Sequence, residues 1–261
     1  MLLSSAPDCV LDAAAQQVLY PEISGRRVLI TGITESFGFD LARTFAEAGA
    51  RLVLNVPNPS EAQEIFCQSL GFEAQDISIH TQKLGSIDAI VSFARTASQV
   101  FGGVDIVINI AELEGAAELA HGVDAGSVEG MVSDLLLPTC LVSRVAANRM
   151  RLTLTEGLVL NIATIKPASS SRQRAFAQLA KVALAQMTRR EAESWAANNI
   201  RFNAIAPQVE MRTTATCGSD TSLVGEMDVA ALAMYLASGR GQALNGHTFE
   251  AEPLPVMFQA A

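Results

Sequence analysis

The stretch Gly25-Arg-Arg-Val-Leu-Ile-Thr-Gly32 decides the fold of this chain. A short apolar run that ends at a glycine is typical of a buried strand followed by a tight turn. A helical pattern of apolar residues follows and stops at Gly49, and a second apolar run, residues 52–56, ends at Pro57. A strand, a helix and another strand in this order predict a right-handed crossover and a parallel sheet.

The same alternation continues along the rest of the chain. Further strands are expected at residues 77–80, 104–110, 157–162, 200–205 and 247–250, and helices at residues 60–70, 86–100, 127–150, 172–197 and 226–238. We therefore predict an α/β protein, a single doubly wound Rossmann-type domain over residues 25–261. Its parallel sheet should have about seven strands, with helices on both faces. Residues 1–24 are expected to form an N-terminal extension.

The composition fits a folded protein and excludes several other classes. Apolar residues make up 49% and charged residues 17%, unlike a disordered chain. The net charge of −9 argues against a nucleic-acid partner. No stretch reaches the roughly 18 consecutive apolar residues of a membrane span, so no membrane is expected as a partner. The first 24 residues contain no Lys or Arg, so no secretory signal peptide is predicted.

The residues that could bind metal or form disulfides are few and scattered. The four cysteines and three histidines form no CxxC pair and show no metal-ligand spacing. They predict reduced thiols, no metal site and a cytoplasmic protein. The chain also has only two tyrosines, Tyr20 in the expected extension and Tyr235 in the expected helix at residues 226–238.

Four stretches resemble motifs of the short-chain dehydrogenase/reductase family. They are the stretch from Gly25 to Gly32, residues 101–109 (Phe-Gly-Gly-Val-Asp-Ile-Val-Ile-Asn), residues 179–184 (Leu-Ala-Lys-Val-Ala-Leu) and residues 199–207 (Asn-Ile-Arg-Phe-Asn-Ala-Ile-Ala-Pro). The resemblance implies a Rossmann fold, an NAD(P) cofactor and an oxidoreductase similar to ketoacyl reductases and hydroxyacyl-CoA dehydrogenases. Because a fold hosts many functions, the residues at the family's functional positions decide the activity.

The family's phosphate loop, T-G-x-x-x-G-x-G, corresponds to Thr31-Gly-Ile-Thr-Glu-Ser-Phe-Gly38. There a helix N-terminus binds pyrophosphate, and the middle glycine lets the backbone approach the ligand. In this chain that glycine is Ser36, and Glu35 adds a negative charge beside the expected phosphates. We therefore expect a degenerate cofactor site. The cofactor positions that the resemblance implies are Thr31, Gly32, Ser36, Phe37, Gly38, Asn109, Ala111 and Thr213.

The other cofactor positions also depart from the family pattern. The end of the second strand, Asn55-Val-Pro-Asn58, offers neither an acidic residue for the ribose of NAD nor a basic residue for the phosphate of NADP. Lys83 replaces an Asp that contacts adenine in the family, and the family's N-N-A-G becomes Asn109-Ile-Ala-Glu112. We therefore expect no cofactor, and NAD(P) if one binds at all.

The residues at the catalytic positions differ most from the family pattern. In the family a Tyr exchanges a proton with the substrate oxygen, a Lys four residues later lowers the pKa of that Tyr, and a Ser and an Asn assist. The resemblance places Lys181 at the lysine and Thr164 at the serine, but Ala177 at the tyrosine and Leu135 at the asparagine. Because alanine has no ionisable proton, ordinary acid–base chemistry is expected to be lost.

Three hypotheses for the function follow. In the family, the long helices that correspond to residues 127–150 and 172–197 form a four-helix interface between subunits. The first hypothesis is a non-catalytic subunit of a homo-oligomer, or of a hetero-oligomer with an active short-chain dehydrogenase. The second is an active NAD(P)-dependent oxidoreductase of a hydroxyl or carbonyl substrate, with an atypical site built on Thr164 and Lys181. The third is a dinucleotide-binding sensor without turnover.

Overall fold

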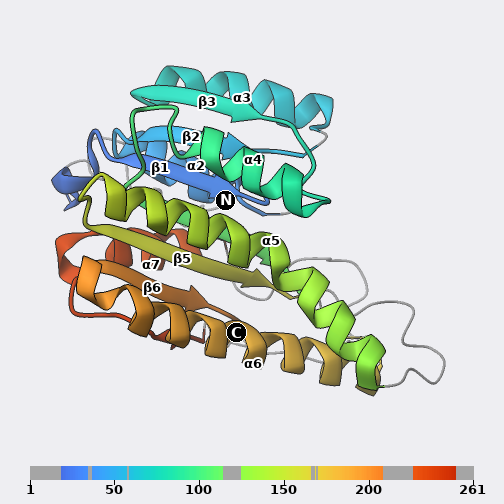
Figure 1. The fold of residues 1–261 in the computed structure, drawn as a ribbon. Helices are drawn as coiled ribbons and strands as arrows, with labels where there is room; N and C mark the ends of the chain where they lie inside the picture. Colours follow the sequence, from blue (N-terminus) through green and yellow to red (C-terminus); the bar gives the residue numbers. More distant parts are fainter. Residues whose placement is uncertain are drawn as a thin grey trace, which may run out of the picture.

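The fold is known from a computed structural model that describes residues 19–34, 37–57, 59–113, 125–165, 168, 170–207 and 226–250. These residues form a seven-stranded sheet in the order β3-β2-β1-β4-β5-β6-β7 (Figure 1). All neighbouring strands are parallel. The strand order reverses between β1 and β4, so the carboxyl ends of these two strands form the switch point at which such folds bind ligands.

The predicted doubly wound Rossmann-type domain, its seven strands and its helices are confirmed. The strands are β1 (Arg27–Thr31), β2 (Arg51–Asn55), β3 (Asp76–His80), β4 (Ile106–Glu112), β5 (Gly157–Thr164), β6 (Ile200–Ile205) and β7 (Thr248–Phe249). The helices are α2 (Phe39–Glu47), α3 (Glu61–Glu73), α4 (Ile87–Ala97), α5 (Ala125–Leu152), α6 (Ser171–Trp195) and α7 (Glu226–Ala237). Short 3-10 helices are η1 (Pro21–Ile23), η3 (Ala196–Asn198) and η5 (Gly239–Gly241). The expected elements differ from these only by a few residues at their ends.

Two hydrophobic layers hold the sheet between its helices. Phe45 of α2, Leu70 of α3 and Met234 of α7 belong to the core cluster on one face. Phe93 of α4 and Met150 of α5 belong to the cluster on the other face, and Figure 1 shows α4, α5 and α6 together on that side. The central strands are buried on both faces, which is why they are continuous apolar runs in the sequence, whereas the outer strands β3 and β7 are partly exposed.

The start of the domain is tied to its core. Ile23 of η1 is fully buried and belongs to the same cluster as α2, α3 and α7. Residues 1–18 lie outside the described part of the chain. The extension over residues 1–24 therefore stays a prediction, although its described end packs on the domain.

Helix α5 combines great length with an apolar composition. It has 28 residues, and among the described helices it is the one long and apolar enough to cross a membrane. Its inner face contributes Val142, Ala146 and Met150 to the core, as expected for a long helix that covers a sheet. The expected absence of a membrane partner stays a prediction.

A partly buried ion pair joins β1 to the segment that leads into β4. Arg27 Nε donates to Asp105 Oδ2 over 2.9 Å, and Arg27 Nη2 donates to Oδ1 over 2.6 Å. The backbone N–H of Arg27 also donates to Oδ2, over 2.8 Å. The two side chains are 23% and 9% exposed. This forked contact fixes two central strands at the edge of the sheet opposite the switch point.

Candidate functional site

The expected phosphate loop connects β1 to α2 at the switch point. Gly32 has a φ of +78°, and a Cβ there would overlap the carbonyl oxygen of Ile110 on β4. Gly38 has a φ of +112° and is the N-cap residue of α2. Both glycines are therefore required by the backbone and by packing, whether or not a ligand binds. Phe37, which lies between Gly32 and Gly38 and directly precedes Gly38, is buried in the core, whereas Ser36 lies outside the described residues.

The N–H groups at the start of α2, which have no acceptor within the helix, donate to a side chain of the same protein. The backbone N–H of Gly38 donates to Glu226 Oε1 over 2.8 Å, and that of Leu41 donates to the same oxygen over 3.0 Å. Burial raises the pKa of the Glu226 carboxyl, and these two backbone bonds offset part of that rise. A protein carboxylate therefore lies where a helix N-terminus of this fold holds pyrophosphate.

Two of the expected cofactor residues take part in a buried polar network. Thr31 Oγ1 donates to Asn109 Oδ1 over 2.9 Å, and Asn109 Nδ2 donates to Ser143 Oγ over 2.9 Å and to Asn161 Oδ1 over 3.0 Å. Asn161 Nδ2 in turn donates to Thr188 Oγ1 over 3.5 Å. All five side chains are buried. The network joins β1, β4 and β5 to α5 and α6, which gives the side chains of Thr31 and Asn109 a structural role.

The catalytic positions expected at 177 and 135 lie in an apolar region between α5, α6 and the strand ends. Ala177 is 3% exposed and shares a buried cluster with Ala111 of β4 and with Leu113, which follows β4. Leu135 of α5 packs against the edge of this cluster. The other buried members are Leu136, Ala163, Ile165, Ala180, Leu184 and Ala206. The region around the expected catalytic positions 177 and 135 therefore consists of apolar side chains.

The two polar residues at expected catalytic positions, Thr164 and Lys181, are on β5 and α6. Thr164 is the last residue of β5, and its register partner is Glu112 at the end of β4. Lys181 Nζ donates to Glu250 Oε1 over 2.8 Å, with the two side chains 14% and 52% exposed. The Lys181 ammonium thus has an internal carboxylate partner just beyond β7. Thr213 lies outside the described residues.

The adenosine side of the expected site is formed by the end of β2. Asn55 is buried, and its Nδ2 donates to the carbonyl oxygens of His80 and Gln82 over 3.3 and 3.0 Å. Its Oδ1 is buried and, among the described residues, has no hydrogen-bond donor. Lys83 is exposed on the segment between β3 and α4. Asn55 therefore joins β2 to the end of β3 and offers one neutral acceptor on this side.

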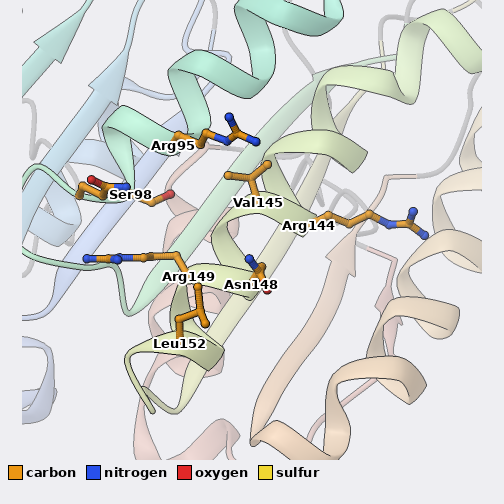
Figure 2. Close-up of a pocket in the computed structure, with 8 residues that line it drawn as sticks. Arg95, Ser98, Arg144, Val145, Asn148, Arg149 and Leu152 are labelled. Atoms are coloured by element: carbon orange, nitrogen blue, oxygen red, sulfur yellow. The ribbon is translucent and has the colours of Figure 1, made fainter.

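A groove between α4 and α5 is separate from all these positions (Figure 2). It has a volume of about 390 Å³ and is lined by Arg95, Ser98, Gln99, Arg144, Val145, Asn148, Arg149 and Leu152. Arg95 and Arg149 belong to the last turns of α4 and α5, where basic side chains offset the partial negative charge of helix C-termini. Arg144 points toward α6 in Figure 2, and its Nε donates to Glu191 Oε1 over 2.7 Å. The groove lies toward the amino ends of the strands, away from the switch point, and Arg144 ties its wall to α6.

Neither Glu226 nor Glu250 stands out in the sequence. An acidic residue in the first turn of a helix is the favourable charge for that same helix, so Glu226 gives a signal for α7 alone. Its contact with Gly38 spans 188 positions, and the Lys181–Glu250 contact spans 69. Sequence patterns describe neighbouring residues only, so they do not predict which residues pair over such distances along the chain.

The strand order and the loop at the switch point define a doubly wound α/β fold of the Rossmann type. The family model of the short chain dehydrogenase matches residues 26–218, and the chain belongs to this family. The family predicted from the sequence is therefore confirmed.

Similar proteins support the assignment over most of the chain. Glucose 1-dehydrogenase 2 of Bacillus subtilis is 25% identical over 192 residues, which is 72% of this chain and 73% of that protein. A putative short-chain alcohol dehydrogenase from Sinorhizobium meliloti 1021 has a structure with a TM-score of 0.71 at 26% identity, covering 88% of this chain and 96% of its own. An NADH-dependent reductase A1-R' complexed with NAD shares the fold at 19% identity, with a TM-score of 0.70 and coverage of 88% and 96%.

Proposed function

We propose that this chain is a non-catalytic member of the short-chain dehydrogenase family that acts as a subunit of an oligomer. The observation that supports this most directly is the buried position of Ala177 within an apolar cluster. A general acid must reach the substrate oxygen to transfer its proton, and an alanine methyl group has no proton to give. Thr164 and Lys181 remain, but the group that they would assist is missing.

The residues at the cofactor positions do not fit a dinucleotide. Glu226 already accepts hydrogen bonds from the N–H groups that a pyrophosphate would need, and its negative charge would repel phosphate. Lys181, which would hold the ribose in the family, is paired with Glu250. At the adenosine side, Asn55 offers a single neutral amide oxygen. We therefore propose that the chain works without NAD(P), although its relatives use such cofactors.

Removing Lys181 tests whether a residual active site exists. In the Lys181→Ala variant we expect a loss of stability below about 1 kcal/mol, because Glu250 is half exposed and solvent screens the pair. Steady-state assays with NADH and NADPH on a panel of ketones and alcohols should show no turnover in either protein. Turnover in the wild type that the variant abolishes would favour an atypical oxidoreductase built on Thr164 and Lys181.

The assembly is proposed from the two long helices. Figure 1 shows the N-terminal turns of α5 and α6 side by side beyond the strand ends, and the Arg144–Glu191 pair ties the two helices together. Leu179 and Val182 on α6 are 47% and 56% exposed. Residues three apart share a helix face, and exposed apolar side chains on a rigid helix pair favour an interface. We call the surface around Leu179 and Val182 the α6 patch.

Charges placed in the α6 patch are expected to dissociate the oligomer. The double variant Leu179→Asp/Val182→Asp would bury two unpaired carboxylates at the contact, which costs several kcal/mol. Light scattering after size-exclusion chromatography measures the mass of the chain alone and co-expressed with a complete short-chain dehydrogenase of the same organism. Phe72→Asp on α3, where the side chain is 92% exposed, is the matched control and should leave the mass unchanged. A wild-type chain that is monomeric in both preparations would contradict the assembly.

We further propose a cytoplasmic location. Cys67 and Cys140 are free thiols, and burial raises the pKa of both. Thiols with a raised pKa form little thiolate and react slowly, so these cysteines suit a reducing compartment in which they only pack.

A further inference from the structure

The N-terminus of α2 already has an anionic partner within the chain. The first N–H groups of a helix lack helical acceptors and carry partial positive charge. Here the N–H groups of Gly38 and Leu41 both donate to Glu226 Oε1, over 2.8 and 3.0 Å. One carboxylate oxygen therefore takes the place that a phosphate oxygen would need.

The position of Glu226 is fixed by the packing of α7. Val229 and Met234 of α7 share a core cluster with Phe45 of α2. At the other end of α7, Arg201 Nη1 donates to the carbonyl oxygens of Leu236 and Gly241 over 3.0 and 2.7 Å. Because the C-terminal end of α7 is bonded to Arg201 and its middle packs in the same cluster as α2, its first residue is held against α2.

We propose that Glu226 is an intramolecular ligand of the α2 N-terminus and determines that this site excludes nucleotide pyrophosphates. The inference rests on the proposed function and names the residue responsible for the lost cofactor binding. The two N–H groups cannot serve a phosphate while they serve Glu226, and two like charges at one helix end repel. In cofactor-dependent proteins of this fold the ligand supplies the anion at this helix end. In this chain the protein supplies it.

The test compares three variants at the start of α7. Glu226→Ala frees both donors, Glu226→Gln keeps an oxygen acceptor without the charge, and Asp228→Ala removes an exposed carboxylate from the same turn. Calorimetric titration uses ADP and, separately, inorganic pyrophosphate as probes. Glu226→Ala is expected to bind ADP and pyrophosphate at least about tenfold more tightly than the wild type. The affinity of Glu226→Gln should lie between those of the wild type and Glu226→Ala. Asp228→Ala should match the wild type.

The possible results separate this inference from the proposed function. Glu226→Ala binding ADP no better than a non-binding wild type would overturn the inference and leave the proposed function standing. Tight ADP binding by the wild type would overturn both. An equal gain in Asp228→Ala would mean a general charge effect and would also overturn the inference. If Glu226→Ala does not fold, the near-isosteric Glu226→Gln variant decides by NMR: the amide resonances of Gly38 and Leu41 should shift selectively, and unshifted resonances would contradict the contact.

Discussion

The Ala177→Tyr variant is expected to lose about 2–4 kcal/mol of stability and to gain no turnover with NADH or NADPH. Tyrosine would restore the family's proton donor in sequence. Ala177 is 3% exposed, however, and shares its cluster with Leu113, Leu136 and Ile165. A phenol ring would overpack this region, and its hydroxyl would be buried among apolar side chains. Chemical denaturation and a steady-state assay measure the two effects.

Ala62→Tyr is the matched control, because Ala62 lies on α3, is exposed and is not part of the α6 patch. It should leave stability almost unchanged, since its ring remains in solvent. A stable Ala177→Tyr variant that reduces a carbonyl substrate would contradict the account. It would mean that the loss of one side chain, and not of a whole site, separates this chain from its active relatives.

The Asp105→Ala variant is expected to lose about 3 kcal/mol, because it leaves the Arg27 guanidinium half buried without its carboxylate. For a domain of this size that loss lowers Tm by roughly 6–12 °C. Asp76→Ala removes the partner of Arg51 from a similar but more exposed pair, 32% and 50% exposed, and should cost less than about 1 kcal/mol. Thermal unfolding compares the two variants. Equal losses of stability in the two variants would mean that burial does not determine how much each ion pair stabilises the protein.

The same pair predicts how stability depends on pH. Burial alone would raise the pKa of Asp105, but the hydrogen bonds and charge of Arg27 outweigh it and lower the pKa below its ordinary value of 3.8. A carboxyl whose pKa is lowered by folding contributes stability above its unfolded pKa and loses it as the pH falls through the folded pKa. The gap between wild type and Asp105→Ala should therefore be constant at neutral pH and shrink below 3.8.

The strands and helices could be predicted because their signals are local. The strands at the centre of a doubly wound sheet are buried on both faces, so the runs at 28–31 and 157–162 are continuous and end at recognisable turns. Gly32 and Gly38 could be placed for the same reason, since each satisfies a backbone requirement that the motif encodes. Only the ends of the elements shifted, because helix termini depend on capping contacts.

The candidate site was predicted less completely because its chemistry depends on contacts between distant residues. The sequence identified Ala177, Leu135 and Ser36 as departures from the family pattern, position by position. It gave no sign that Glu226 bonds to α2 or that Glu250 bonds to Lys181, since each pairing forms only when the sheet brings separate elements together. Thr31 and Asn109 were expected near a cofactor, and their side chains serve the core network.

The most direct test of the account is a calorimetric titration of the purified wild-type chain with NADH and with NADPH. Glu226 at the α2 N-terminus and the Lys181–Glu250 pair predict no measurable binding of either dinucleotide up to millimolar concentration. The Glu226→Ala variant is the positive comparison, in which affinity should rise. A micromolar dissociation constant for either cofactor in the wild type would contradict the central claim that the chain no longer uses NAD(P).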